Sequence, residues 1–167
     1  MQRATVGTAD RVARIAQMEQ WETSMKAKLV NEIGERTFVV VFDAGEEVVS
    51  GLTGFARLNG LLAASFTAIG AFSDVTLGFF DYESKDYKEV PVNEQVELLS
   101  LVGNVAVYEG EPKLHAHVVV GKRDGTAYGG HLLEAHVRPT LEVVAVELPE
   151  FLQRKIDKDT GLPLIKL

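Results

Sequence analysis

From Lys26 onward, hydrophobic residues recur at alternate positions in short runs that are rich in β-branched and aromatic side chains. This alternation is typical of β-strands that bury one face. Turn-forming pairs such as Asn59-Gly60 and Asp124-Gly125 separate the runs. The pattern predicts strands over Lys28–Val30, Thr37–Phe42, Leu62–Ala68, Val75–Tyr82, Val96–Val102, Val105–Tyr108, Lys113–Val120, Thr126–His131 and Leu141–Leu148.

One segment instead repeats its hydrophobic residues at helical spacing, which predicts a helix over Glu46–Leu58. Asp43 and Glu46 have the spacing of a capping box at its start. Gly51 and Gly54 each weaken such a helix by about 1 kcal/mol relative to Ala, which is tolerable if the helix packs closely on a sheet. One helix among many strands predicts an α+β fold with a largely antiparallel sheet.

The two ends of the chain differ from this central part. Residues 1–24 are polar, with hydrophobic residues at three-residue spacing, and form either a short amphipathic helix opening near Thr8 or a mobile extension. The folded domain is expected to span residues 25–148. Residues 149–167 are charged and are expected to lie on the surface as a C-terminal tail.

Composition narrows the classes of function. The 167 residues fit one domain, and the absence of cysteine excludes disulfides and thiolate metal sites. The net charge of −7 disfavours nonspecific DNA binding, which needs Lys and Arg to displace counterions. The longest nearly apolar stretch, Leu61 to Phe72, is too short to span a bilayer, and the N-terminus lacks a signal-peptide core. We therefore expect a cytoplasmic protein without a membrane partner.

The histidines are the most informative residues, since all four fall between positions 115 and 136. His115 and His117 lie two apart in one predicted strand, so both side chains share a face, with Cα atoms about 6.6 Å apart. The predicted turn at Asp124-Gly125 can fold His131 back beside them. Gly129-Gly130 would permit a close approach of backbones there.

Three imidazoles suit Zn²⁺, with Fe, Ni or Cu as alternatives, and they leave a coordination position open, as in catalytic sites. His136 is five residues beyond His131 and falls on the opposite face of a continuous strand, so it is excluded. Glu97, Glu134 and Glu142 are candidates for a fourth ligand or a base, although each is more simply a solvated carboxylate. The simpler alternative for the histidines is a set of surface side chains without a metal.

Several segments together resemble the plants-and-prokaryotes-conserved (PPC) domain, and the resemblance covers roughly residues 25–148. The segments are Ser65–Ala71, Leu77–Asp81, Glu97–Val105, Lys113–His117 and Gly129–Leu132. The resemblance implies an antiparallel sheet with a packed helix and a homotrimer. It also implies a metal, usually zinc, on the histidines that match His115, His117 and His131, with no ligand matching His136.

Prokaryotic PPC proteins are commonly labelled as candidate DNA-binding proteins. Their plant relatives grip the minor groove through a separate AT-hook with an Arg-Gly-Arg-Pro core, which this sequence does not contain. The PPC fold is also similar to that of acetolactate decarboxylase, a zinc enzyme that uses three histidines. A shared fold does not by itself establish a shared function.

Three functions follow as hypotheses. The first is a metal-binding trimeric module that acts through protein partners, for example in regulation. The second is a metal-dependent enzyme for a small carbonyl or carboxylate substrate. The third, ranked last, is a DNA-binding regulator. For the trimer, Phe79-Phe80 is a candidate interface, although burial in the core explains these residues equally well.

Overall fold

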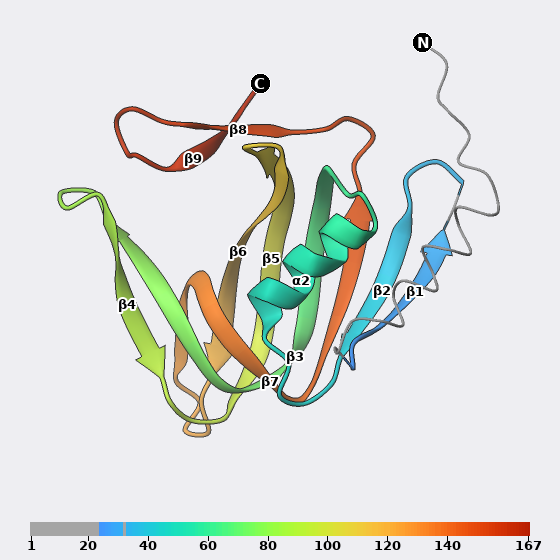
Figure 1. Cartoon of the computed structure of the whole chain (residues 1–167). Helices are drawn as coiled ribbons and strands as arrows, with labels where there is room; N and C mark the ends of the chain where they lie inside the picture. Colours follow the sequence, from blue (N-terminus) through green and yellow to red (C-terminus); the bar gives the residue numbers. More distant parts are fainter. Residues whose placement is uncertain (1–23, 32) are drawn as a thin grey trace, which may run out of the picture.

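The computed structural model describes residues 24–31 and 33–167, and within them a single helix packs on a large β-sheet (Figure 1). The sequence analysis leaves a short helix and a mobile extension as alternatives for residues 1–24. Residues 1–23 lie outside the described part of the chain, so neither alternative is tested. The elements are β1 (Lys26–Asn31), β2 (Thr37–Phe42), α2 (Val48–Leu58), β3 (Ala63–Asp81), β4 (Asp86–Val92), β5 (Val96–Tyr108), β6 (Glu111–Gly121), β7 (Ala127–Glu147), β8 (Gln153–Ile156) and β9 (Pro163–Lys166).

The described strands form one nine-stranded sheet in the order β1-β2-β7-β3-β5-β8-β9, with β4 paired to β3 and β6 paired to both β5 and β7. All of these pairings are antiparallel except β5 with β8. Because β3 pairs with β5 and β7, and β6 joins β5 to β7, these four strands form a closed ring. The largely antiparallel α+β fold predicted from the sequence is therefore confirmed.

Several strands that the sequence analysis separates are continuous in the structure. β3 joins two predicted strands through a register shift between Ala68 and Gly70, β5 joins two more, and β7 runs unbroken over 127–147. At Gly70, a Cβ would overlap the carbonyl oxygen of Thr140, so glycine permits β3 to bend closely against β7. β4, β8 and β9 are strands that the pattern does not predict.

The helix begins two residues later than predicted, because Glu47 rather than Asp43 caps it. The Glu47 carboxylate accepts the N–H groups of Val49 and Ser50 at 2.8 and 2.6 Å. Glu46 instead accepts the N–H of Asp43 at 2.7 Å and that of Met25 at 2.8 Å, so it ties the preceding loop to β1. The longer side chain at position 47 thus satisfies the first turn of the helix.

Close packing of the helix on the sheet is confirmed at Gly51, where a Cβ would overlap the ring of Phe42. The buried core lies between α2 and the sheet and includes Phe42, Phe55, Phe66 and Phe72. On the opposite face, Ile69, Leu99, Val102 and Val144 are 62%, 56%, 55% and 42% exposed. We call these four residues the outer apolar face. Large apolar side chains on neighbouring strands that stay this exposed form a hydrophobic surface patch.

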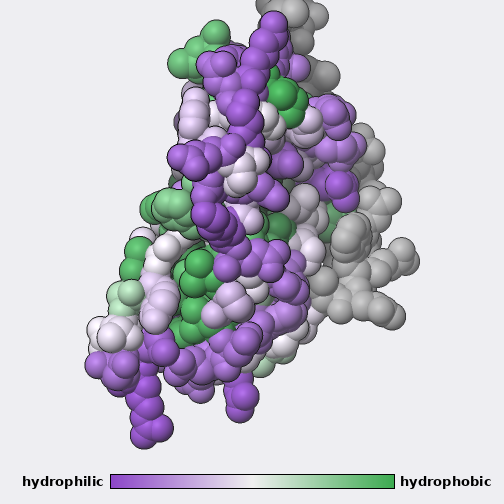
Figure 2. All heavy atoms as spheres, turned by 90° about the vertical axis from the view of Figure 1, so that its left-hand side faces the viewer, coloured by the Kyte–Doolittle hydropathy of each residue, from purple (hydrophilic) through white to green (hydrophobic). Residues whose placement is uncertain are grey.

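The side of the molecule formed by β4 has a different character. Seen from that side, the surface is mainly hydrophilic and carries one hydrophobic cluster in its lower half (Figure 2). The exposed hydrophobic side chains of β3 and β4 include Phe79, at 65%, and Val90, at 36%. Among the described residues, no helix is both long and apolar enough to cross a membrane.

The C-terminal tail forms a hairpin of β8 and β9, which crosses one end of the sheet (Figure 1). Val107 donates its N–H to the carbonyl oxygen of Leu152 at 2.7 Å, which attaches the hairpin to β5. Arg154 from β8 is buried, at 5% exposed. The tail is therefore partly integrated into the fold, whereas the sequence analysis expects a surface segment.

Candidate metal centre

Strand β6 presents two of the candidate ligands on the face that points away from the core. Ala116, Val118 and Val120 are buried, while His115 is half-buried and His117 is exposed. This alternation follows from the two-residue period of a strand. The predicted common face of the two histidines is confirmed.

The predicted hairpin brings the third histidine beside them. Gly125 takes a φ of +84°, and its N–H donates to Lys122 at 2.9 Å, while Lys122 donates its own N–H to Thr126 at 2.8 Å. The resulting register sets His131 of β7 directly opposite His117 of β6. The turn chemistry of Asp-Gly therefore fixes which residues meet.

Glycines allow β7, which carries His131, to lie close to β3. A Cβ at Gly130 would lie 2.9 Å from the carbonyl oxygen of Gly78 in β3, so β7 and β3 meet here without intervening side chains. A Cβ at Gly78 would in turn lie 2.7 Å from the ring of Tyr87. The Tyr87 ring stacks on the imidazole of His131, with ring centroids 4.8 Å apart and an interplanar angle of 26°.

The three imidazoles, which we call the histidine triad, converge on one point. Their candidate ligand atoms all lie within 4.8 Å of one another, and the Nε2 atoms of His115 and His117 are 3.2 Å apart. Ring centroids are separated by 4.9 Å between His115 and His131 and by 5.4 Å between His117 and His131. The sequence prediction that these side chains come together is confirmed.

The electrostatic setting favours the neutral form of two imidazoles of the triad, those of His115 and His131. Burial, followed by the neighbouring His115 and His117, lowers the pKa of His131 to about 4. Burial, followed by the charge of Arg154, lowers the pKa of His115. Neutral imidazole is the form that binds metal ions, because a protonated nitrogen has no free lone pair.

An unpaired polar atom supports the fit between the triad and a cation. The Nδ1 atom of His131 is buried and has no hydrogen-bond partner among the described residues. A buried polar atom without a partner is costly, and coordination to an ion is one way to offset that cost. Three neutral nitrogen donors are a suitable set for Zn²⁺ and related ions.

The fourth histidine has a different environment. The His136 Nδ1 lies 2.8 Å from Asp74 Oδ1, an interaction that raises the pKa of His136, and its Nε2 lies 3.9 Å from Glu134. Its exclusion from the ligand set agrees with this pairing. Glu97 is opposite Gly121 in β6, and Glu142 is opposite Val41 in β2. Among the described residues, the cluster of possible ligands contains the three histidines and no carboxylate.

Two residues near the triad were not identified from the sequence. Tyr87 lies on the unpredicted β4, and the only local signal for it is a glycine, Gly78, inside a strand. Arg154 donates from Nη2 to the side-chain oxygen of Asn104, which is opposite His115 across the β5–β6 pairing. Its charge lowers the pKa of both His115 and His131.

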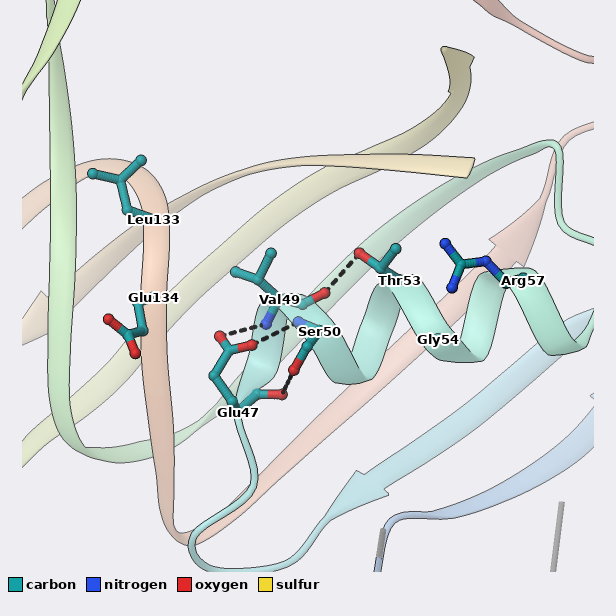
Figure 3. Close-up of a pocket in the computed structure, with 8 residues that line it drawn as sticks. All are labelled: Glu47, Val49, Ser50, Thr53, Gly54, Arg57, Leu133 and Glu134. Atoms are coloured by element: carbon teal, nitrogen blue, oxygen red, sulfur yellow. Dashed lines mark hydrogen bonds between the residues drawn. The ribbon is translucent and has the colours of Figure 1, made fainter. Parts of the chain in front are cut away.

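Two cavities lie on the surface away from the histidine triad. One, of about 570 Å³, lies between the exposed side of α2 and the β7 residues Leu133 and Glu134 (Figure 3). The other, of about 360 Å³, lies over the outer apolar face and includes Thr67 and Glu142.

The fold and the site together define a small, mainly antiparallel β protein with a three-histidine candidate metal centre near its surface. The chain belongs to the family of the Plants and Prokaryotes Conserved (PCC) domain, whose profile matches residues 31–149. This is the PPC family that the sequence motifs resemble. A curated relative, the bifunctional protein GlmU of a Synechococcus strain, is 30% identical over 120 residues, which are 70% of this chain. The match spans only 18% of that protein.

Three solved structures are similar to this chain over almost their own whole length. A candidate DNA-binding protein from Bacteroides thetaiotaomicron is 30% identical, with a TM-score of 0.77, covering 84% of this chain and 96% of its own. A PPC protein from Pyrococcus horikoshii is 34% identical, with a TM-score of 0.75 and coverages of 85% and 95%. A protein described as metal-containing, from Archaeoglobus fulgidus, is 35% identical, with a TM-score of 0.74 and coverages of 86% and 98%.

A more distant neighbour shares only the fold. This Staphylococcus aureus protein of unknown function, described as similar to α-acetolactate decarboxylase, is 14% identical with a TM-score of 0.51. The alignment covers 72% of this chain and 53% of that protein. At this level of identity, the similarity carries no information about the reaction.

Proposed function

We propose that this protein is a metal-binding module that holds a divalent transition metal, Zn²⁺ first among them, on His115, His117 and His131. The observation that carries the proposal is the convergence of three imidazoles, with candidate ligand atoms within 4.8 Å of one another. The metal-containing relative from Archaeoglobus fulgidus supports it. The bound ion would supply a Lewis acid that polarises an oxygen of a ligand.

Metal content measured by elemental analysis tests this proposal. The protein is stripped with a chelator, reloaded with Zn²⁺ and desalted. We expect about one zinc per chain in the wild type and almost none in His117→Ala, because two imidazoles seldom hold zinc through desalting. His136→Ala is the matched control and should retain its zinc, since His136 pairs with Asp74. Equal zinc in wild type and His117→Ala would refute the ligand assignment.

We further propose that the module is a homotrimer that buries the outer apolar face. Ile69, Leu99, Val102 and Val144 expose between 42% and 62% of their surface, and a cavity of about 360 Å³ hollows this face. Contiguous exposed apolar side chains of this kind mark interaction surfaces. Val102 is opposite His117 in the β5–β6 pairing, so the face borders the metal centre.

Light scattering tests the assembly and its location. The wild type should have three times the mass of one chain, and Ile69→Lys should shift it toward one chain, because a buried unpaired charge opposes association. Phe79→Lys serves as the comparison, since Phe79 is 65% exposed at the other end of β3. Dissociation by Phe79→Lys alone would move the interface to the Phe79-Phe80 segment.

The role of the module is proposed to be regulatory, through protein partners, in the cytoplasm. The absence of cysteine fits that reducing compartment. The second candidate is a metal-dependent enzyme for a small carbonyl or carboxylate compound. Its supporting observation is the exposure of His117, which leaves the triad reachable from solvent. Turnover of such a compound that disappears in His117→Ala would favour the enzyme.

Direct DNA binding has weaker support. A solved relative is named a candidate DNA-binding protein, but this chain has 24 acidic and 17 basic residues other than histidine. DNA binding by counterion displacement must weaken steeply as salt is raised. A gel-shift titration at low salt that shows no complex would end this alternative.

A further inference from the structure

Arg154 carries a buried positive charge without a negative partner. The side chain is 5% exposed, and no ion pair of the described residues includes it. Its Nη1 donates to the carbonyl oxygen of Pro163 at 3.1 Å and its Nη2 to the side chain of Asn104, both neutral acceptors. Its Nε has no hydrogen-bond partner in the described part of the chain. A buried charge without a partner of opposite sign is costly. A bound anion near Arg154 would reduce this cost.

This charge lies beside the histidine triad. Asn104, which Arg154 contacts, is directly opposite His115, and the side chains of paired residues share a face of the sheet. A divalent cation on three neutral imidazoles would therefore stand near a second positive charge with no carboxylate among its ligands.

We propose that the metal centre takes a small oxyanion, a carboxylate or a phosphate, as its ligand and that Arg154 balances the charge of this ligand. The inference rests on the proposed metal-binding function. An anion between the two positive charges converts their repulsion into two attractions, and burial of Arg154 strengthens the attraction on its side. The free Nε–H of Arg154 is a remaining donor for such a ligand.

Thermodynamic linkage makes this inference measurable without an activity assay. If anion and metal bind together, the anion must raise the affinity for the metal by the same factor as the metal raises the affinity for the anion. Calorimetry measures zinc binding to the metal-free full chain in four arms: zinc without additive, with acetate, with methyl phosphate, and with imidazole as a neutral ligand for comparison. The acetate and methyl phosphate arms distinguish a carboxylate from a phosphate ligand.

In the wild type, we expect at least one of the two anions to raise zinc affinity about tenfold, which corresponds to about 1.4 kcal/mol. In Arg154→Gln, this gain should disappear, while zinc alone binds no more weakly than in the wild type, because a repulsion has been removed. A purely structural role would instead weaken zinc binding in every arm. Arg154→Lys should retain part of the gain, and Lys155→Gln, an exposed neighbour, should match the wild type.

Each remaining outcome is decisive. If Arg154→Gln binds zinc and retains the full anion gain, the role of Arg154 is overturned and the metal centre stands. If neither anion raises zinc affinity in the wild type, the oxyanion ligand is overturned whether or not the variants fold. If the wild type binds no zinc, the proposed function itself fails, and this inference fails with it.

Discussion

Tyr87 contacts the histidine triad without belonging to it. Its ring stacks on His131 at 4.8 Å and also contacts Phe80 edge-on at 5.4 Å, so the imidazole rests against a fixed aromatic surface. Such ring contacts contribute about 0.5–1.5 kcal/mol. We expect Tyr87→Leu to weaken zinc binding roughly threefold to tenfold and Tyr87→Phe to leave it nearly unchanged, as measured by calorimetry. Tyr82→Leu, on the exposed turn beside β4, is the control.

The lowered pKa of His131 predicts how pH acts on the metal-free protein. His131 has a pKa of about 4 in the fold against about 6.5 in an unfolded chain. Between these values only the unfolded chain is protonated at this residue, so stability is lost as pH falls through this window. In a chelator, the melting temperature should fall more from pH 7 to pH 5 in the wild type than in His131→Gln. Equal falls would show that His131 does not contribute.

At this scale, the sequence predicts a residue's position only where local geometry sets it. The common face of His115 and His117 follows from strand parity, and the approach of His131 follows from the Asp-Gly turn. Tyr87 meets His131 because β3 pairs with both β4 and β7, and Arg154 comes near His115 because β8 pairs with β5. Neither arrangement follows from the residues next to Tyr87 or Arg154 in the sequence. The residues that surround the triad are therefore set by tertiary structure.

Among the elements, α2 packs closely on the sheet at Gly51, although glycine has a low helix propensity. Alanine at position 51 would favour an isolated helix by about 1 kcal/mol, but its Cβ would overlap the ring of the buried Phe42. Overpacking of this kind costs about 1–3 kcal/mol. We expect Gly51→Ala to lower the free energy of unfolding in urea, whereas Ser50→Ala, on the exposed side, changes it by about 0.5 kcal/mol or less. A stabilised Gly51→Ala would contradict the packing.

The limits of prediction at the element scale have physical causes. The predicted boundaries at Asn59-Gly60 and at the 123–126 turn are correct, because turn residues there act locally. The breaks predicted inside β3, β5 and β7 are wrong, because register shifts let a strand bend and continue through glycine and polar positions. β4 was missed because its exposed residues and Pro91 lack the alternation of a half-buried strand.

On the scale of the whole molecule, the closed ring of β3, β5, β6 and β7 carries the triad, and the C-terminal hairpin adds a charged residue near it. Two of the three histidines lie on β6 and the third on β7, which pair directly. The β8–β9 hairpin adds Arg154 from residues beyond the family match, which ends at residue 149. Fold and charge at the site thus come from different parts of the chain.

Truncation after Pro149 separates these two contributions. It removes the Leu152 carbonyl that accepts the N–H of Val107 and the guanidinium that fills the space beside Asn104, so we expect the melting temperature to fall by about 5 °C or more. The truncated chain should still bind zinc, because the triad and the ring remain, but acetate and methyl phosphate should no longer raise its zinc affinity. Removal of Leu167 alone, which is fully exposed, should change neither property. An unchanged melting temperature together with an intact anion effect would mean that the tail is a surface extension and that another group balances the charge of the ligand.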